Sequence, residues 1–148
     1  MILDALLEMS DAQAVTATAI STNVIDLGPV TDNPTRDIGT GEDVYWVVSV
    51  DTTFTGLTSL QAALVSDTTL GLQSAPVTHA TTIAIPVASL VAGYQYAVKL
   101  PPGSYKQYLG TQFTVVGTGT AGKVNSFLTK DVQAYRAYAD RQPIAPNA

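Results

Sequence analysis

The sequence predicts an all-β protein, an antiparallel sandwich of two sheets with about eight strands, and a jelly roll is the best specific arrangement. Short runs of alternating apolar and polar residues are typical of half-buried strands. Turn-forming residues separate these runs at regular spacing, and no long stretch has helical periodicity. An immunoglobulin-like sandwich has a similar number of strands and stays open as the alternative.

The central strand is expected at residues 44–50, a run of β-branched and aromatic residues that holds the only tryptophan. Because side chains alternate along a strand, four large apolar residues share one face: Val44, Trp46, Val48 and Val50. Burying each such side chain contributes about 1.5–3 kcal/mol, and tryptophan buries the most area. We therefore expect the core to be centred on Trp46.

The segments before this strand are read as an arm, strands and a loop. Residues 1–12 begin with an apolar stretch too short for a stable helix, so they are interpreted as an N-terminal arm that docks on a neighbour. Residues 15–27 alternate Thr with Ala or Val and continue to Gly28-Pro29, which predicts one long or two short strands. Residues 31–43 are dense in turn formers and predict an exposed loop.

Alternation after the central strand predicts further strands over residues 60–65, 77–85 and 94–100, the last of which ends at Pro101-Pro102-Gly103. Residues 108–116 and 124–132 predict a hairpin around the glycine-rich turn at 117–122. The proline-containing residues 135–148 predict an extended C-terminal arm. Together these elements make one sandwich domain over residues 1–148.

The distribution of charge is uneven along the chain. Residues 1–74 carry a net charge of −9 and residues 75–148 a net charge of +4, within a total of −5. The two halves pair either within the fold or between neighbouring subunits and partners, and both alternatives stay open. Only 13% of the residues are charged, which favours a surface partly covered by other protein. The scattered bases disfavour nucleic-acid binding, and no apolar span approaches the ~20 residues of a membrane helix.

Residues that carry chemistry are few. The absence of cysteine excludes disulfides and thiolate metal sites, and His79 is the only histidine, without a triad pattern, so it is interpreted as a surface or edge-strand residue. Asp32-Asn33 and Glu42-Asp43 lack the spacing of a calcium loop. The glycine-rich stretch at 117–122 lacks the GK[ST] ending of a phosphate loop. We therefore predict no enzyme, no catalytic residue, no metal and no cofactor.

The aromatic residues divide into core and contact candidates. Tyr94 and Tyr96 share a face with Val98, which favours a place in the core. Tyr105 and Tyr108 follow the Pro-Pro-Gly turn and are predicted to make exposed contacts. Phe127 is expected to face outward, covered either by a second sheet or by another subunit.

Several stretches together resemble the capsid cement, or decoration, proteins of tailed bacteriophages of the Bordetella-phage type. They cover most of the chain: MILDALL (1–7), SDAQAV (10–15), STNVIDLG (21–28), RDIG (36–39) followed by GE (41–42), LVAGY (90–94), LPPG (100–103), YLG (108–110), TAG (120–122), and DVQA (131–134) with RAY (136–138).

The resemblance implies a non-enzymatic virion protein of jelly-roll type, made in the host cytoplasm and bound to the outer capsid surface. It implies the major capsid protein as a partner, a homodimer, and neither nucleic acid nor membrane as a ligand. Our candidates for the capsid or subunit interface are the arm residues and outward aromatics: Ile2, Leu3, Leu6, Leu7, Tyr105, Tyr108, Phe127, Tyr135 and Tyr138. The alternative function is a carbohydrate- or receptor-binding β-sandwich module of a phage particle.

Overall fold

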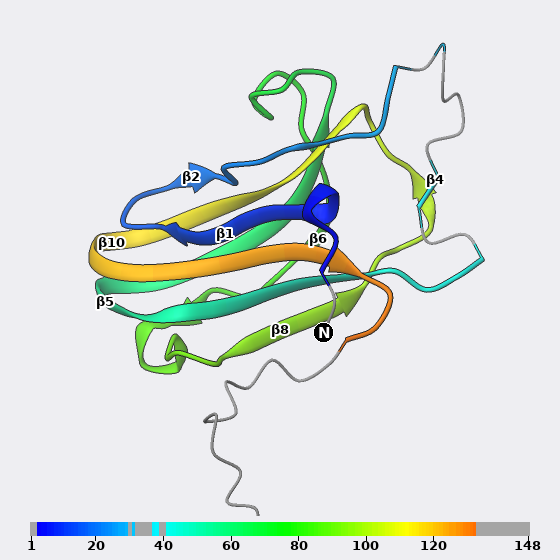
Figure 1. Cartoon of the computed structure of the whole chain (residues 1–148). Helices are drawn as coiled ribbons and strands as arrows, with labels where there is room; N and C mark the ends of the chain where they lie inside the picture. The colour runs from blue at the N-terminus through cyan, green and yellow to red at the C-terminus, as the bar shows by residue number, and fades with distance from the viewer. Residues whose placement is uncertain (1–2, 30, 32–36, 39–40, 133–148) are drawn as a thin grey trace, which may run out of the picture.

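The computed structural model describes residues 3–29, 31, 37–38 and 41–132, and within them the protein is all-β (Figure 1). The described residues form ten strands: β1 (Glu8–Ala14), β2 (Ala19–Ile20), β3 (Ile25–Asp26), β4 (Asp37–Ile38), β5 (Tyr45–Asp67), β6 (Val77–Thr81), β7 (Ile85–Pro86), β8 (Gln95–Lys99), β9 (Gly103–Ser104) and β10 (Tyr108–Thr129). Eight of them form one antiparallel sheet, and β4 pairs with β9 separately. The predicted fold class is confirmed.

The helical content of the described residues is limited to two 3₁₀ turns, η1 (Ala5–Leu7) and η2 (Val87–Ser89). Among these residues, no helix is long and apolar enough to cross a membrane.

Strands β5 and β10 form a long antiparallel ribbon on which the other strands assemble. Their register runs from Tyr45 opposite Thr129 to Asp67 opposite Tyr108. Figure 1 shows both strands turning back at the left end of the molecule. Gly56 and Gly117 lie near this bend with φ angles of +86° and +89°, which residues with a side chain rarely adopt. The ribbon therefore folds over and makes two layers.

The two layers divide the short strands between them. The first half of β5 and the second half of β10 carry β8 and β1 at their outer edges. The second half of β5 and the first half of β10 carry β6, β7, β2 and β3. A rolled antiparallel ribbon of this kind is the jelly-roll arrangement.

The predicted hairpin of residues 108–116 with 124–132 is wrong. The two halves of β10 pair with β5, β1, β2 and β3 and not with each other, and the strand ends at Thr129. The glycine-rich run does reverse the chain, but it does so together with the bend in β5, so both strands pass from one layer to the other. A tight two-strand turn is not formed.

Trp46 lies at the centre of the core, as predicted, and is fully buried. Its indole Nε1 donates to Ser126 Oγ at 3.0 Å in its own layer and to Thr111 Oγ1 at 3.2 Å in the opposite layer. Tyr96 meets the indole edge-on, with ring centroids 6.0 Å apart. Tyr94 and Tyr96, both predicted to lie in the core, are half-buried and pack against the buried cluster.

One edge of the sandwich is joined by hydrogen bonds between β1 and the segment from β2 to Asn23. Asn23 N donates to Met9 O at 2.8 Å, and Gln13 Nε2 donates to Ile20 O at 2.8 Å. The N-terminal arm predicted over residues 1–12 is wrong from Glu8 onward, because β1 begins there and Met9 is fully buried. Residues 1–2 and the predicted C-terminal arm at 135–148 lie outside the described residues.

Candidate functional site

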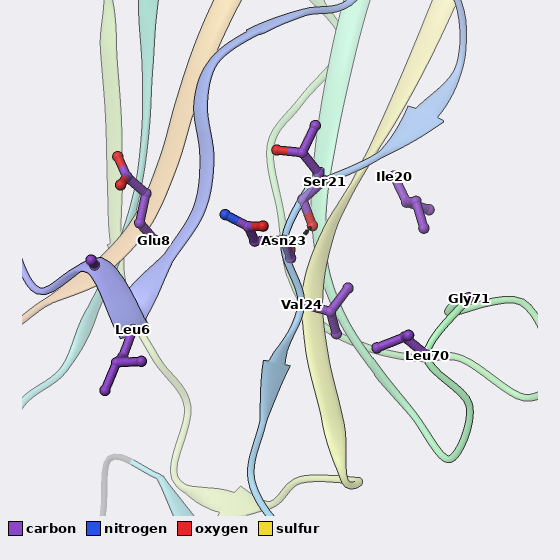
Figure 2. A pocket seen from close by; sticks show the side chains of 10 residues that line it. Leu6, Glu8, Ile20, Ser21, Asn23, Val24, Leu70 and Gly71 are labelled. Atoms are coloured by element: carbon purple, nitrogen blue, oxygen red, sulfur yellow. Dashed lines mark hydrogen bonds between the residues drawn. The ribbon is translucent and has the colours of Figure 1, made fainter.

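An open groove of about 640 Å³ lies between η1, the segment from β2 to β3, and the loop that follows β5 (Figure 2). Its lining is mainly aliphatic and small polar: Ala5, Leu6, Glu8, Ile20, Ser21, Thr22, Asn23, Val24, Leu70 and Gly71. In Figure 2, Leu6 and Leu70 stand at the two sides of the groove, with Val24 between them. The groove thus combines residues from three separate parts of the chain.

The first wall is the η1 turn, which Asp4 caps. The Asp4 carboxylate accepts from Leu6 N at 2.9 Å, and Asp4 O accepts from Leu7 N at 2.9 Å. The turn directs its two leucines differently: Leu7 packs against the core, whereas Leu6 is 81% exposed. Leu7 therefore anchors the turn and Leu6 is presented to solvent.

The second wall is the loop of residues 68–75, which the buried Asp67 carboxylate holds closed. This carboxylate accepts from the backbone N–H groups of Thr68 at 2.6 Å, Ser74 at 2.8 Å and Ala75 at 3.2 Å. Burial by itself would raise the pKa of Asp67. The hydrogen bonds from the backbone N–H groups have the larger combined effect and hold the pKa below its usual value. Lys106 Nζ also donates to Ala75 O. The loop therefore has a fixed shape.

Leu72 and Leu70 have opposite roles in this loop. Leu72 is fully buried, adopts a φ of +52°, and lies against Gly110, where an added Cβ would come within 2.6 Å of Leu72 Cδ1. Two residues earlier, Leu70 is 61% exposed. Gly110 leaves room for the side chain of Leu72. The buried Leu72 in turn fixes the position at which Leu70 is exposed.

The floor of the groove is held by bonds to β10. Ser21 N donates to Thr111 O at 2.7 Å, and Thr111 N donates to Ser21 Oγ at 3.1 Å. Ser21 Oγ in turn donates to Asn23 O at 2.8 Å. The groove is therefore formed in advance of any ligand and needs little reorganisation to accept one.

Glu8 is the only charged residue among the ten that line the groove. It is half-buried, and desolvation together with the charge of Asp11 raises its pKa. Within the described part of the chain, no hydrogen bond or ion pair ends on its carboxylate. The groove is thus apolar with one unpartnered acid.

The sole histidine, His79, lies on the edge strand β6 and does not line the groove. His79 Nε2 is 2.7 Å from Ser66 Oγ, and its ring stacks on Tyr105 with centroids 3.9 Å apart. Ser66 is fully buried and also accepts from Lys106 N at 3.0 Å. Burial lowers the pKa of His79. These contacts tie the strand to the segment after β9, and the described residues contain no group of three or more His, Cys, Asp or Glu able to hold a metal ion.

Two of the predicted contact residues are buried. The prediction that Tyr105 is exposed is wrong: it is only 1% exposed, because the chain after Pro101-Pro102 folds back and its hydroxyl donates to Pro101 O at 2.7 Å. Phe127 lies on the outward side of its layer, opposite Val47, but is also 1% exposed. Its own chain covers Phe127, so neither residue is free to contact another subunit.

The remaining predicted contact residues are placed as follows. Leu6 lines the groove, and Leu3 and Tyr108 are half-buried. Ile2, Tyr135 and Tyr138 lie outside the described residues. Sequence reasoning missed Leu70 and Glu8, although a leucine within a turn-rich stretch was a signal for Leu70.

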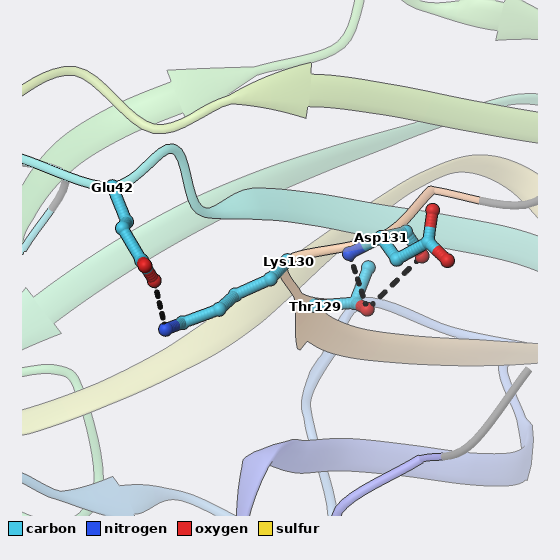
Figure 3. A network of polar contacts seen from close by, with 4 residues as sticks. All are labelled: Glu42, Thr129, Lys130 and Asp131. Carbon is cyan, nitrogen blue, oxygen red and sulfur yellow. Dashed lines mark hydrogen bonds and ion pairs between the residues drawn. The ribbon is translucent and has the colours of Figure 1, made fainter.

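Both ion pairs found among the described residues join an acid of the first half of the chain to a base of the second half. Lys99 Nζ lies 2.6 Å from Asp43 Oδ1, and Lys130 pairs with Glu42 (Figure 3). The hydrogen bond to Asp43 raises the pKa of Lys99, and the hydrogen bond and charge of Lys130 lower the pKa of Glu42. For these four residues the two halves pair within the fold.

Comparison with known proteins identifies a matching family. The family model described as Bbp16 matches residues 9–128, from the start of β1 almost to the end of β10. No curated protein matches the chain.

Proposed function

The chain belongs to the Bbp16 family, a phage structural protein family, and from this membership we propose that it is a capsid cement protein. In this proposal it binds the outer surface of the shell formed by the major capsid protein and bridges neighbouring subunits. The match over residues 9–128 is the observation that carries the proposal, because it spans nearly the whole sandwich.

The groove supports a role in binding protein. Exposed aliphatic side chains that gather on one preformed surface mark interaction sites more often than isolated ones do. Leu6 and Leu70 are 81% and 61% exposed and are held at the same groove by anchored turns. A capsid subunit that covered them would remove this apolar surface from water.

The proposal includes no reaction, cofactor, nucleic acid or membrane. The imidazole of His79 is engaged by Ser66 and Tyr105, and the carboxylate of Asp67 is engaged by backbone N–H groups. These groups act as structural contacts. A bridging protein stabilises a shell by adding contacts to several subunits at once, since each further contact forms at high effective concentration. The homodimer predicted from the family resemblance would double the number of such contacts.

Co-sedimentation tests the proposal. The purified chain is mixed with shells assembled from the major capsid protein alone, pelleted, and quantified, and the temperature of shell disassembly is measured in parallel. We expect saturable binding and a higher disassembly temperature. A chain that stays in the supernatant but binds glycans would contradict the cement role and favour the carbohydrate- or receptor-binding module.

A further inference from the structure

We propose that the groove between Leu6 and Leu70 is the site that receives the capsid subunit. The occupant is an exposed segment of the major capsid protein in which an aliphatic side chain stands next to a lysine or arginine. This inference rests on the proposed function and adds to it the position of the contact and the chemistry that is recognised.

The apolar part of the occupant follows from the shape and lining of the groove. A volume of about 640 Å³ lies within the range of about 300–1,000 Å³ that is typical of small-molecule sites, so the groove has room for a side chain of another protein. Leu6 and Leu70 stand at its two sides with Val24 between them (Figure 2), so an aliphatic side chain entering the groove is contacted from several directions. Both leucines belong to anchored turns, so little conformational freedom is lost on binding.

The basic part of the occupant follows from Glu8. Glu8 lies on the same wall as Leu6 in Figure 2 and is half-buried as a residue, and its carboxylate has no partner among the described residues. The ten lining residues include no base to neutralise it. A lysine or arginine beside the inserted side chain supplies the missing charge and the hydrogen-bond donors.

A second copy of the chain fits this groove poorly. In a two-fold contact the same surface meets itself, so Glu8 would approach its own counterpart across the axis. Asp4 and Asp11 are exposed within four residues of Glu8 in sequence, so the negative charge extends beyond the groove. Like charges oppose such a contact, whereas a basic segment of another protein is attracted to it.

Site-directed cross-linking tests the position of the contact. Because the chain has no cysteine, Leu70→Cys carries a single thiol that a benzophenone maleimide can label. The labelled protein is bound to shells, irradiated, and the products are identified by mass spectrometry. Ile83→Cys is the matched control, because Ile83 is 78% exposed and does not line the groove.

We expect Leu70→Cys, and not Ile83→Cys, to cross-link to a capsid peptide that contains an aliphatic residue beside a lysine or arginine. Cross-links only to another copy, or only to residues 133–148 of this chain, would overturn the groove assignment while co-sedimentation still upheld the cement role. Failure of the unmodified chain to co-sediment would instead reject the cement role itself.

Affinity for shells tests the chemistry. Glu8→Gln should weaken binding about fivefold and make it less sensitive to salt, because one ion pair is lost. Asp51→Asn, at an exposed acid outside the groove, should leave the affinity for shells and its sensitivity to salt unchanged. Leu6→Ser should weaken binding about tenfold, whereas Ile83→Ser should not. Circular dichroism and thermal unfolding confirm that each variant is folded. Equal losses in a variant and its control would overturn the assignment.

Discussion

Gly122→Ala should strongly destabilise the protein, because Gly122 lies where the β5–β10 ribbon bends. Its φ is +140°, and a Cβ built there would come within 2.1 Å of Phe54 Cδ1. Phe54 is buried in the core, so its ring can move aside only by displacing its packed neighbours. Backbone strain of about 1–3 kcal/mol and overpacking of about 1–3 kcal/mol together give a loss of about 2–6 kcal/mol, centred at about 4 kcal/mol.

Two other glycines separate these causes. Gly93 has a φ of +89°, but no atom lies within 4 Å of the position that an added Cβ would take, so Gly93→Ala should cost only the strain, about 1–2 kcal/mol. Gly71 has neither a positive φ nor an atom within 4 Å of an added Cβ, so Gly71→Ala should change the free energy of unfolding by less than about 0.5 kcal/mol.

Urea unfolding followed by tryptophan fluorescence measures all three free energies, since Trp46 reports on the core. For a chain of this size, Gly122→Ala should also lower the Tm by about 10–15 °C. Combining it with Phe54→Leu should recover part of the loss, because the smaller side chain relieves the clash. If Gly122→Ala is no worse than Gly93→Ala, the close packing of the bend against Phe54 is refuted.

Three further predictions concern the core, the N-terminus and pH. Trp46→Phe should lower the free energy of unfolding by about 2 kcal/mol, because it leaves a cavity and removes the indole donor to Thr111 and Ser126. A loss of less than about 0.5 kcal/mol in urea unfolding would contradict this prediction. Deleting residues 1–6 should leave the Tm nearly unchanged while weakening co-sedimentation with shells. Deleting residues 1–9, which removes the buried Met9, should lower the Tm. Equal Tm values for the two deletions would argue against the anchoring role of Met9. Because burial holds the pKa of His79 below its usual value, the unfolded state takes up a proton first as the pH falls below about 6.5, so the Tm should fall between pH 7.5 and 5. His79→Gln should lack that part of the decline, and an identical decline in both proteins would refute it.

The strands could be predicted from the sequence where the signal is local. Alternation predicts residues 44–50 and 94–100 correctly, because one face of each strand must be apolar to cover the core. The pairing of β10 could not be predicted in the same way. A glycine-rich run is compatible with a hairpin and with a bend shared by two strands, and only the matching bend near Gly56 decides between them.

The candidate site was predictable only in part, because it too depends on contacts between residues that are far apart in the sequence. The apolar N-terminus indicated Leu6, whose exposure depends on a short capped turn. Leu70 depends on Asp67 gathering three backbone N–H groups and on the space left by Gly110, and neither is visible as a pattern of neighbouring residues. The burial of Tyr105 was not predictable either, because it results from the return of the chain after Pro101-Pro102.

The ribbon of β5 and β10 has a consequence for the order in which the protein is synthesised. About forty residues separate the end of β5 from the start of β10, so β5 leaves the ribosome long before its principal partner exists. Until then the apolar run around Trp46 has an unpaired edge, a state that favours aggregation. β1 stays unpaired for even longer, because it pairs with the last part of β10, which is synthesised later. Slow translation or a shortage of chaperones should therefore reduce the soluble yield of this chain more than its final stability suggests.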